Sequence, residues 1–226
     1  MNKKVYLAAA ITSMILLSSC LTSLQRLVTY STVTTDNRII GNWQYEGLPI
    51  KIESIPGSHF YNEILASFST TEEKKSVYES KEDSMLYTKS YVVDFIKKGY
   101  RYYMACSLIR LGNDIFADIE PIDAKPLNNP TTKDVDDLFH GGTYISSHSI
   151  AKVVFREKET EFRFLNSDFI LDQLKNGRVS IKYEKDDLFQ TNLITSSSKD
   201  LQQFLAKYGN DERLYSKENT VTLKKI

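Results

Sequence analysis

The sequence predicts a mainly β domain, an antiparallel meander that closes into a barrel or a barrel-like sandwich and carries two or three short helices. After residue 36 the chain consists of short apolar runs with a period of two residues, separated by turn residues such as Gly, Pro and Asn. Nearly all connections are short enough to join antiparallel neighbours. A twisted sheet of about ten such strands tends to curl or close, because an open sheet leaves exposed edges.

The first part of this domain is expected to form hairpins. The Pro56-Gly57 pair fits the two central positions of a type II turn, since Pro fixes φ at one and Gly supplies positive φ at the other. The charged stretch Thr70–Ser84 is expected to be a solvated loop or a surface helix turn. Three strands are predicted around these features: Ile39–Glu46, Leu48–Ile55 and His59–Ser69.

The centre of the domain is predicted to be a meander of three strands. Lys98-Gly99 separates two long runs of aromatic and β-branched residues and indicates a tight hairpin. The expected strands are Tyr87–Lys97, Tyr100–Leu111 and Ile115–Ile119, followed by a loop over 124–132 and a short helix from Thr132 to Leu138.

The last part alternates strands and helices. Ser197, with Asp200 three residues later, resembles a capping box for a helix over Lys199–Tyr208. Another helix is expected over Asp168–Leu174, ending at Gly177. The expected strands are Ile150–Glu157, Glu161–Leu165, Arg178–Tyr183, Leu188–Thr195 and Val221–Leu223.

The start of the chain has the pattern of a secretory signal. Lys3 and Lys4 precede an apolar run, Val5–Leu17, that is shorter than the roughly 20 residues a helix needs to span a bilayer. The sequence therefore divides into a signal peptide (1–19), a Thr- and Ser-rich tether (20–36) and a single β-rich domain (37–226).

Leu17-Ser18-Ser19-Cys20 resembles the lipobox of bacterial lipoproteins, in which small residues precede a cysteine that is acylated and becomes the first residue of the mature chain. The resemblance implies that Cys20 carries the lipid, palmitate included, and anchors the protein to a membrane. Two or more acyl chains hold firmly, since each buried methylene contributes ~0.8 kcal/mol. By resemblance to sorting in Gram-negative cells, the acid-free residues 21–24 suggest the periplasmic face of the outer membrane.

Gly41-Asn42-Trp43 resembles the Gly-x-Trp signature of lipocalin-like barrels, which implies that Trp43 packs across the closed end. The second lipocalin signature, Thr-Asp-Tyr, is missing, and Arg213 is the candidate to stack on Trp43. Such a tryptophan is also a core residue in any β domain. A likeness to uncharacterised bacterial lipoproteins covers Leu111–Pro121 and Ser149–Leu174 and carries no activity.

The composition argues against nucleic acid as a partner, because 29 Lys and Arg balance 29 Asp and Glu. Cys106 lies in an apolar run and is expected to be a small buried hydrophobe. The chain holds 14 Tyr and 11 Phe. Tyr100 and Tyr102, on one face of a strand, could line an apolar cavity together with Trp43, or pack the core and cover the membrane-proximal surface.

The polar residues offer weak candidates for chemistry. His59, His140 and His148 lack metal-ligand spacing, and Ser149 lacks a nucleophile elbow, so His148 is expected to bond a loop backbone. Asp118 and Glu120 project from one strand face at a distance that suits glycoside hydrolysis, but an acidic solvent face gives the same spacing and is the preferred interpretation. Asp134, Asp136 and Asp137 are expected to be a charged helix start, because they lack the glycine and glutamate of a calcium loop.

The sequence therefore predicts no catalytic residue, metal or cofactor. The first expectation is a non-enzymatic, lipid-anchored barrel that binds a hydrophobic or amphiphilic ligand, or a partner protein of the envelope. The alternative is a structural or accessory component of an outer-membrane assembly. An enclosed pocket would favour the first and a filled interior the second, whereas a cleft that joins His148 to Asp118 or Glu120 would favour a hydrolase.

Overall fold

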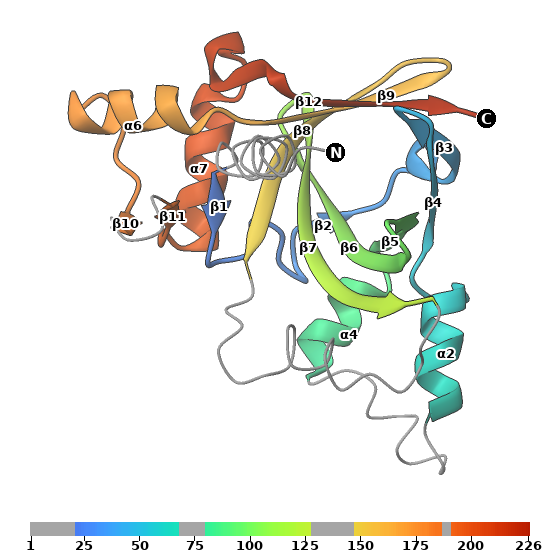
Figure 1. Cartoon of the computed structure of the whole chain (residues 1–226). Helices are drawn as coiled ribbons and strands as arrows, with labels where there is room; N and C mark the ends of the chain where they lie inside the picture. Colours follow the sequence, from blue (N-terminus) through green and yellow to red (C-terminus); the bar gives the residue numbers. More distant parts are fainter. Residues whose placement is uncertain (1–20, 68–79, 128–146, 187–190) are drawn as a thin grey trace, which may run out of the picture.

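The computed structural model describes residues 21–67, 80–127, 147–186 and 191–226. Eight antiparallel strands close into a barrel in which each strand pairs with the next and the last pairs with the first (Figure 1). The predicted fold class is confirmed. The barrel strands are β3 (Gly41–Tyr45), β4 (Leu48–Ser54), β5 (Tyr91–Lys97), β6 (Tyr100–Leu111), β7 (Asp114–Pro126), β8 (His148–Phe155), β9 (Glu159–Leu165) and β12 (Tyr215–Lys225).

The interior of the barrel is filled by apolar side chains. Successive residues of a strand point to opposite faces, so every second position contributes to this core. Cys106 is fully buried there, as predicted. The other buried members are Ile39, Trp43, Ile50, Ile52, Tyr91, Leu108, Ile115, Ala117, Ile119, Ala151, Val153, Phe162 and Leu223.

Residues 21–36 are part of the folded domain, so the predicted tether is wrong for this segment. β1 (Thr22–Ser23) pairs antiparallel with β8 and parallel with β11 (Thr191–Ile194), and β2 (Val33–Thr34) pairs with β6. Leu21, Leu27 and Val28 are buried. This stretch is rich in Thr and Ser, but its apolar side chains are buried in a core, and the free energy gained by that burial is enough to order the segment.

Helix α7 (Ser198–Tyr208) lies beside β1 and β11 on the outside of the barrel, and helix α6 (Ser167–Lys175) projects outward from the same side (Figure 1). α6 starts at its N-cap Asn166, and α7 starts at Ser197, whose hydroxyl accepts the N–H of Asp200 as predicted. Their buried residues join Leu21, Leu27 and Val28 in a second apolar core outside the barrel: Ile170, Leu201, Phe204 and Leu205.

The predicted strand His59–Ser69 is wrong, because the chain forms helix α2 (His59–Ser67). The Ser58 hydroxyl accepts the N–H of Tyr61, which satisfies a free donor of the first turn. The Phe60 ring packs on Tyr103 with centroids 4.8 Å apart. The strand that pairs with β4 is instead β5.

The predicted strand Tyr87–Lys97 starts too early. Tyr87 is the last residue of helix α4 (Lys81–Tyr87), whose N-cap is Ser80, and β5 begins at Tyr91. Residues 80–84, where a solvated loop or a surface helix turn is predicted, therefore form the helix start. The described residues contain four α-helices, and the helix predicted over Thr132–Leu138 lies outside them.

Two other predicted strand boundaries differ. β7 runs on to Pro126, through a register shift opposite Tyr103 and Met104, so residues 124–126 of the predicted loop are strand. A bulge at this point accommodates Pro121, which lacks a backbone donor. The strand predicted over Arg178–Tyr183 is displaced, because β10 (Tyr183–Asp186) begins at the last residue of that range; it pairs antiparallel with β11, which lies within the predicted strand Leu188–Thr195.

Candidate functional site

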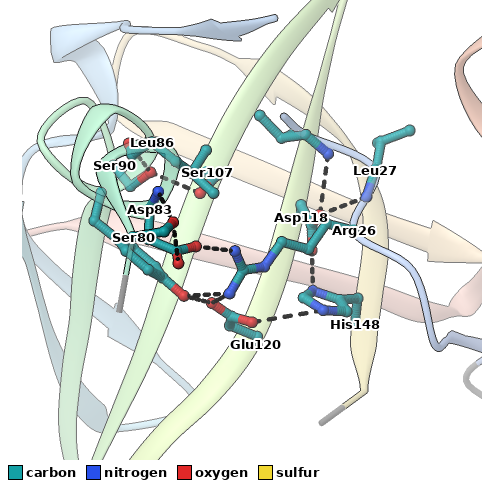
Figure 2. A network of polar contacts seen from close by, with 12 residues as sticks. Arg26, Leu27, Ser80, Asp83, Leu86, Ser90, Ser107, Asp118, Glu120 and His148 are labelled. Atoms are coloured by element: carbon teal, nitrogen blue, oxygen red, sulfur yellow. Dashed lines mark hydrogen bonds and ion pairs between the residues drawn. The ribbon is translucent and has the colours of Figure 1, made fainter. Parts of the chain in front are cut away.

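A buried cluster of charged side chains lies on the outer wall of the barrel, between β7, β8, helix α4 and the N-terminal segment (Figure 2). Asp118 and Glu120 alternate along β7, so both point away from the interior that holds Ala117 and Ile119. They are 5% and 8% exposed. The prediction that they share a face is therefore confirmed, whereas the preferred interpretation as an acidic solvent face is wrong.

Asp118 binds the N-terminal segment to the barrel. One carboxylate oxygen, Oδ2, accepts the backbone N–H groups of Leu27 at 2.6 Å and Val28 at 3.1 Å. The other, Oδ1, lies 2.8 Å from Nδ1 of His148. Charge-assisted bonds of this kind are about twice as strong as neutral ones. Asp118 thus supplies the hydrogen bonds that these two buried peptide groups need.

Arg26 joins the same segment to helix α4. Its guanidinium donates to Oδ1 of Asp83 at 2.8 Å and to the hydroxyl of Tyr87 at 2.7 Å, and it lies 3.5 Å from Glu120 (Figure 2). The Tyr87 hydroxyl donates to Glu120. Burial, with the negative charge of Glu120, raises the pKa of Tyr87 far above its ordinary value, so the hydroxyl keeps its proton.

His148 occupies the centre of this cluster. Its Nδ1 faces Asp118, and its Nε2 lies 3.5 Å from Glu120. The expectation that it bonds a loop backbone is therefore wrong. We call the six side chains that tie the N-terminal segment to β7, β8 and α4 the N-terminal clamp: Arg26, Asp83, Tyr87, Asp118, Glu120 and His148.

A histidine between two carboxylates is an acid–base arrangement, but this one is closed. The space bordered by Val28, Glu120 and His148 is too small for a water molecule. A hydrolytic site needs room for substrate and water beside its base. The arrangement instead suits a structural task, which is to satisfy buried donors and hold residues 26–28 against the barrel.

Trp43, one of the predicted ligand-binding residues, lies on the first barrel strand and is 2% exposed. Its Nε1 donates to the carbonyl of Ile39 at 2.9 Å, and Nζ of Lys225 lies 5.7 Å from its ring centre. Arg213 stacks instead on Phe169 and pairs with Asp211, so its predicted contact with Trp43 is wrong. The late cation over this tryptophan is Lys225.

The two predicted tyrosines lie near the same end of the barrel face. Cross-strand register runs from Trp43 to Ile50, Phe95 and Tyr102, which places these residues in one row. Tyr102 stacks on Phe95 with centroids 5.2 Å apart, and Tyr100, 39% exposed, follows at 6.4 Å from Tyr102. Tyr102 thus lies in the same row as Trp43, whereas Tyr100 lies two residues further along β6, at the solvent-exposed end.

An apolar groove of about 490 Å³ crosses the outer face of β3, β4 and β5. Asn42, Lys51 and Asp94 are successive register partners on this face, opposite to the row of Trp43. Ile96 and Ile226 border the groove and are 47% and 67% exposed. We call this feature the wall groove. Its charges pair with neighbours on the protein, Arg101 with Asp94 and Lys51 with Glu53.

A second groove, of about 650 Å³, separates residues 25–32 from the start of α7 and is polar. Some of its hydroxyl groups bond within the protein: Thr29 to Thr32, and Ser197 to the first turn of α7. Gln202 donates to the carbonyl of Leu27 across the groove. These contacts hold the N-terminal segment on α7.

The remaining candidates do not assemble into a site. In the part of the chain that the structure describes, no group of three His, Cys, Asp or Glu side chains could hold a metal ion. His59 lies 3.6 Å from Glu63, and His140 and Asp134–Asp137 are outside the described residues. Burial raises the pKa of the Cys106 thiol to about 12, so this thiol keeps its proton at neutral pH.

Cys20 and the residues of the lipobox-like pattern are outside the described residues. No described helix has the length and apolar character required to cross a membrane. Comparison with known proteins found no matching family model, no matching curated protein and no matching solved structure.

Proposed function

We propose that this protein is a lipid-anchored, non-enzymatic binding protein of the Gram-negative envelope, held at the periplasmic face of the outer membrane by acyl chains on Cys20. The support is the short apolar run that ends in Leu17-Ser18-Ser19-Cys20. The closed packing around His148 also favours a binding role over a hydrolytic one.

The observation that carries the binding role is the wall groove. Its volume of about 490 Å³ falls within the range of roughly 300–1,000 Å³ that is typical of small-molecule sites. It exposes Ile96 and Ile226 while its charged groups are paired on the protein. Such a surface suits the apolar part of an amphiphile. Because side chains fill the barrel interior, the ligand would bind on the wall.

The filled interior also favours the second candidate function, a structural or accessory component of an outer-membrane assembly. In that case an envelope protein would cover the wall groove. In the first candidate function the wall groove binds a small amphiphile, and in the second it contacts an envelope protein. Binding of a small amphiphile to the groove would therefore favour the first.

The test has two parts. Mass spectrometry of the N-terminal peptide, from protein purified from its own host, should show acyl chains on Cys20, and Cys20→Ala should abolish both acylation and membrane fractionation. Native mass spectrometry of the same protein reports any small molecule that stays bound.

The groove is then probed with the fluorescent amphiphile anilinonaphthalene sulfonate. We expect Ile96→Glu to weaken binding at least 10-fold, because a charge replaces an apolar contact. Met85→Glu is the matched control, since Met85 is 43% exposed and lies on α4, outside the groove. Equal affinity of wild type, Ile96→Glu and Met85→Glu, with no bound small molecule, would favour the structural role.

A further inference from the structure

The folded domain begins one peptide bond after Cys20. Leu21 is 3% exposed and belongs to the apolar core under α6 and α7. Thr22 and Ser23 pair with β8 on one side and with β11 on the other, and the N–H of Leu24 donates to Ile194 at 2.9 Å. The chain therefore has no free residue between Leu21 and the sheet.

The N-terminal clamp follows within a few residues and fixes the same segment. Leu27 and Val28 are fully buried, and Asp118 accepts both of their N–H groups. Arg26 adds its contacts to Asp83 and Glu120. Residues 21–28 could act as a spacer only if the sheet pairing, the apolar contacts and the clamp were all broken together.

We infer that the barrel lies directly against the bilayer surface, with the edge formed by β1, β11 and β10 nearest to the lipid headgroups. This inference depends on the proposed acylation of Cys20. Consecutive Cα atoms are about 3.8 Å apart, so acyl chains on Cys20 hold Leu21 at the level of the headgroups. A free tether over residues 21–36 would instead have given the domain a reach of roughly 50 Å.

The consequence for function concerns where a ligand or partner is met. A domain held in this way does not search the space between membranes. It contacts molecules that lie in the same membrane or at its surface, and its orientation relative to the membrane is restricted by the pairing of β1.

The experiment compares two fluorophores on acylated, full-length protein in vesicles of phosphatidylethanolamine and phosphatidylglycerol that contain headgroup-level nitroxide lipid as a quencher. One fluorophore is attached at Glu184→Cys. Glu184 pairs with Leu193, which pairs with Thr22, so it lies two strands, roughly 10 Å, from β1.

The second fluorophore is attached at Lys98→Cys, in the β5–β6 turn. Tyr100, near this turn, pairs with Pro126 at one end of β7. The β7 residue in register with Thr22 is Ile119, since both pair with Ser149 of β8. Pro126 and Ile119 are seven residues apart along β7. Lys98 is therefore more than roughly 20 Å from Thr22. The buried Cys106 does not compete for the label.

We expect the Glu184→Cys label to be quenched at least 3-fold more than the Lys98→Cys label. A spacer of about 12 Gly and Ser residues between Cys20 and Leu21, which spans roughly 20 Å, should remove that difference. Equal quenching of the two labels, or no effect of the spacer, on protein whose N-terminal peptide carries acyl chains would overturn the inference alone. An N-terminal peptide without acyl chains would overturn the proposed function and this inference together.

Discussion

The two outer walls of the barrel consist of similar strands and differ in what lies over them. Over β7 and β8, the N-terminal segment, α4 and α7 cover the wall and bury Asp118, Glu120 and His148. Over β3, β4 and β5, the wall groove leaves Ile96 and Ile226 exposed. We refer to these regions as the covered wall and the open wall.

The difference shows how burial changes the weight of a polar contact. On the covered wall Asp118 has three buried partners, and these groups have no access to water as a replacement partner if Asp118 is removed. On the open wall the Asp94 carboxylate is also buried, at 7% exposed, but its partner Arg101 is 28% exposed and lies over the Tyr103 ring, so water can take the place of the guanidinium if Arg101 is removed. Loss of a partner should therefore be costly on the covered wall and mild on the open wall.

The largest expected effect is that of Asp118→Ala. It leaves the N–H groups of Leu27 and Val28 unbonded and His148 without its carboxylate. Breaking a buried pair from one side costs about 3–5 kcal/mol, and we expect this loss in the free energy of unfolding measured with urea. Asp118→Asn, which keeps one acceptor oxygen, should lose about 1–2 kcal/mol. A loss below about 1 kcal/mol for Asp118→Ala would show that the clamp contributes little.

Arg101→Ala tests the open wall. The substitution removes the two hydrogen bonds to Asp94, at 2.9 and 2.6 Å, but water can reach part of the site. We expect a loss of about 1–2 kcal/mol in the same urea measurement. Arg101→Lys keeps the charge without the two-pronged geometry and should fall between wild type and Arg101→Ala. A loss equal to that of Asp118→Ala would break the distinction between the walls.

Most strands of the barrel could be predicted from the sequence because they follow local patterns. The period of two residues and the turn at Lys98-Gly99 predict the β5–β6 hairpin and the bounds of β6 without long-range information. The prediction failed at residues 59–67, where a Ser58 side chain that caps a helix outweighed the apolar pattern. Capping by one hydroxyl is a local signal, and it was present in the sequence.

The covered wall could not be predicted in this way. Its contacts join residues that lie 57 positions apart for Arg26 and Asp83, and 91 positions apart for Leu27 and Asp118. Strand spacing correctly put Asp118 and Glu120 on one face. That face is shielded from water because Leu27 and Val28 are buried against the barrel. These two residues belong to a segment whose Thr- and Ser-rich composition is typical of a tether, so its packing was not predicted.

The barrel interior supplies a third environment, and Thr160→Val sharpens the comparison there. Thr160 is 1% exposed and points inward like Phe162, and within the described residues its hydroxyl has no hydrogen-bond partner. An unbonded buried hydroxyl destabilises the fold, so its replacement by a methyl group of the same shape should stabilise it by about 1 kcal/mol in thermal or urea unfolding. Thr160→Ser retains the hydroxyl, loses a methyl group and should not stabilise. A gain in Thr160→Ser would contradict this explanation.

The smallest expected effect concerns the exposed end of the covered wall. Burial disfavours the charged form of Asp83, but hydrogen bonds from Ser80 and Arg26 outweigh it and lower the pKa of this carboxyl. A carboxyl whose pKa is lowered by folding stabilises the fold at pH values above its pKa in the unfolded chain, which is about 3.9. This contribution is lost as the pH falls through its pKa in the folded protein. Because Asp83 and Arg26 are partly exposed, the contribution should be about 0.5–1 kcal/mol and should shrink in added salt.

Urea unfolding of wild type and Asp83→Asn from about pH 6 to pH 2 should show two curves that converge at the acid end. Asp36 and Glu161, whose pKa values are also lowered, affect both proteins equally, so curves that stay parallel to pH 2 would mean that Asp83 does not anchor Arg26.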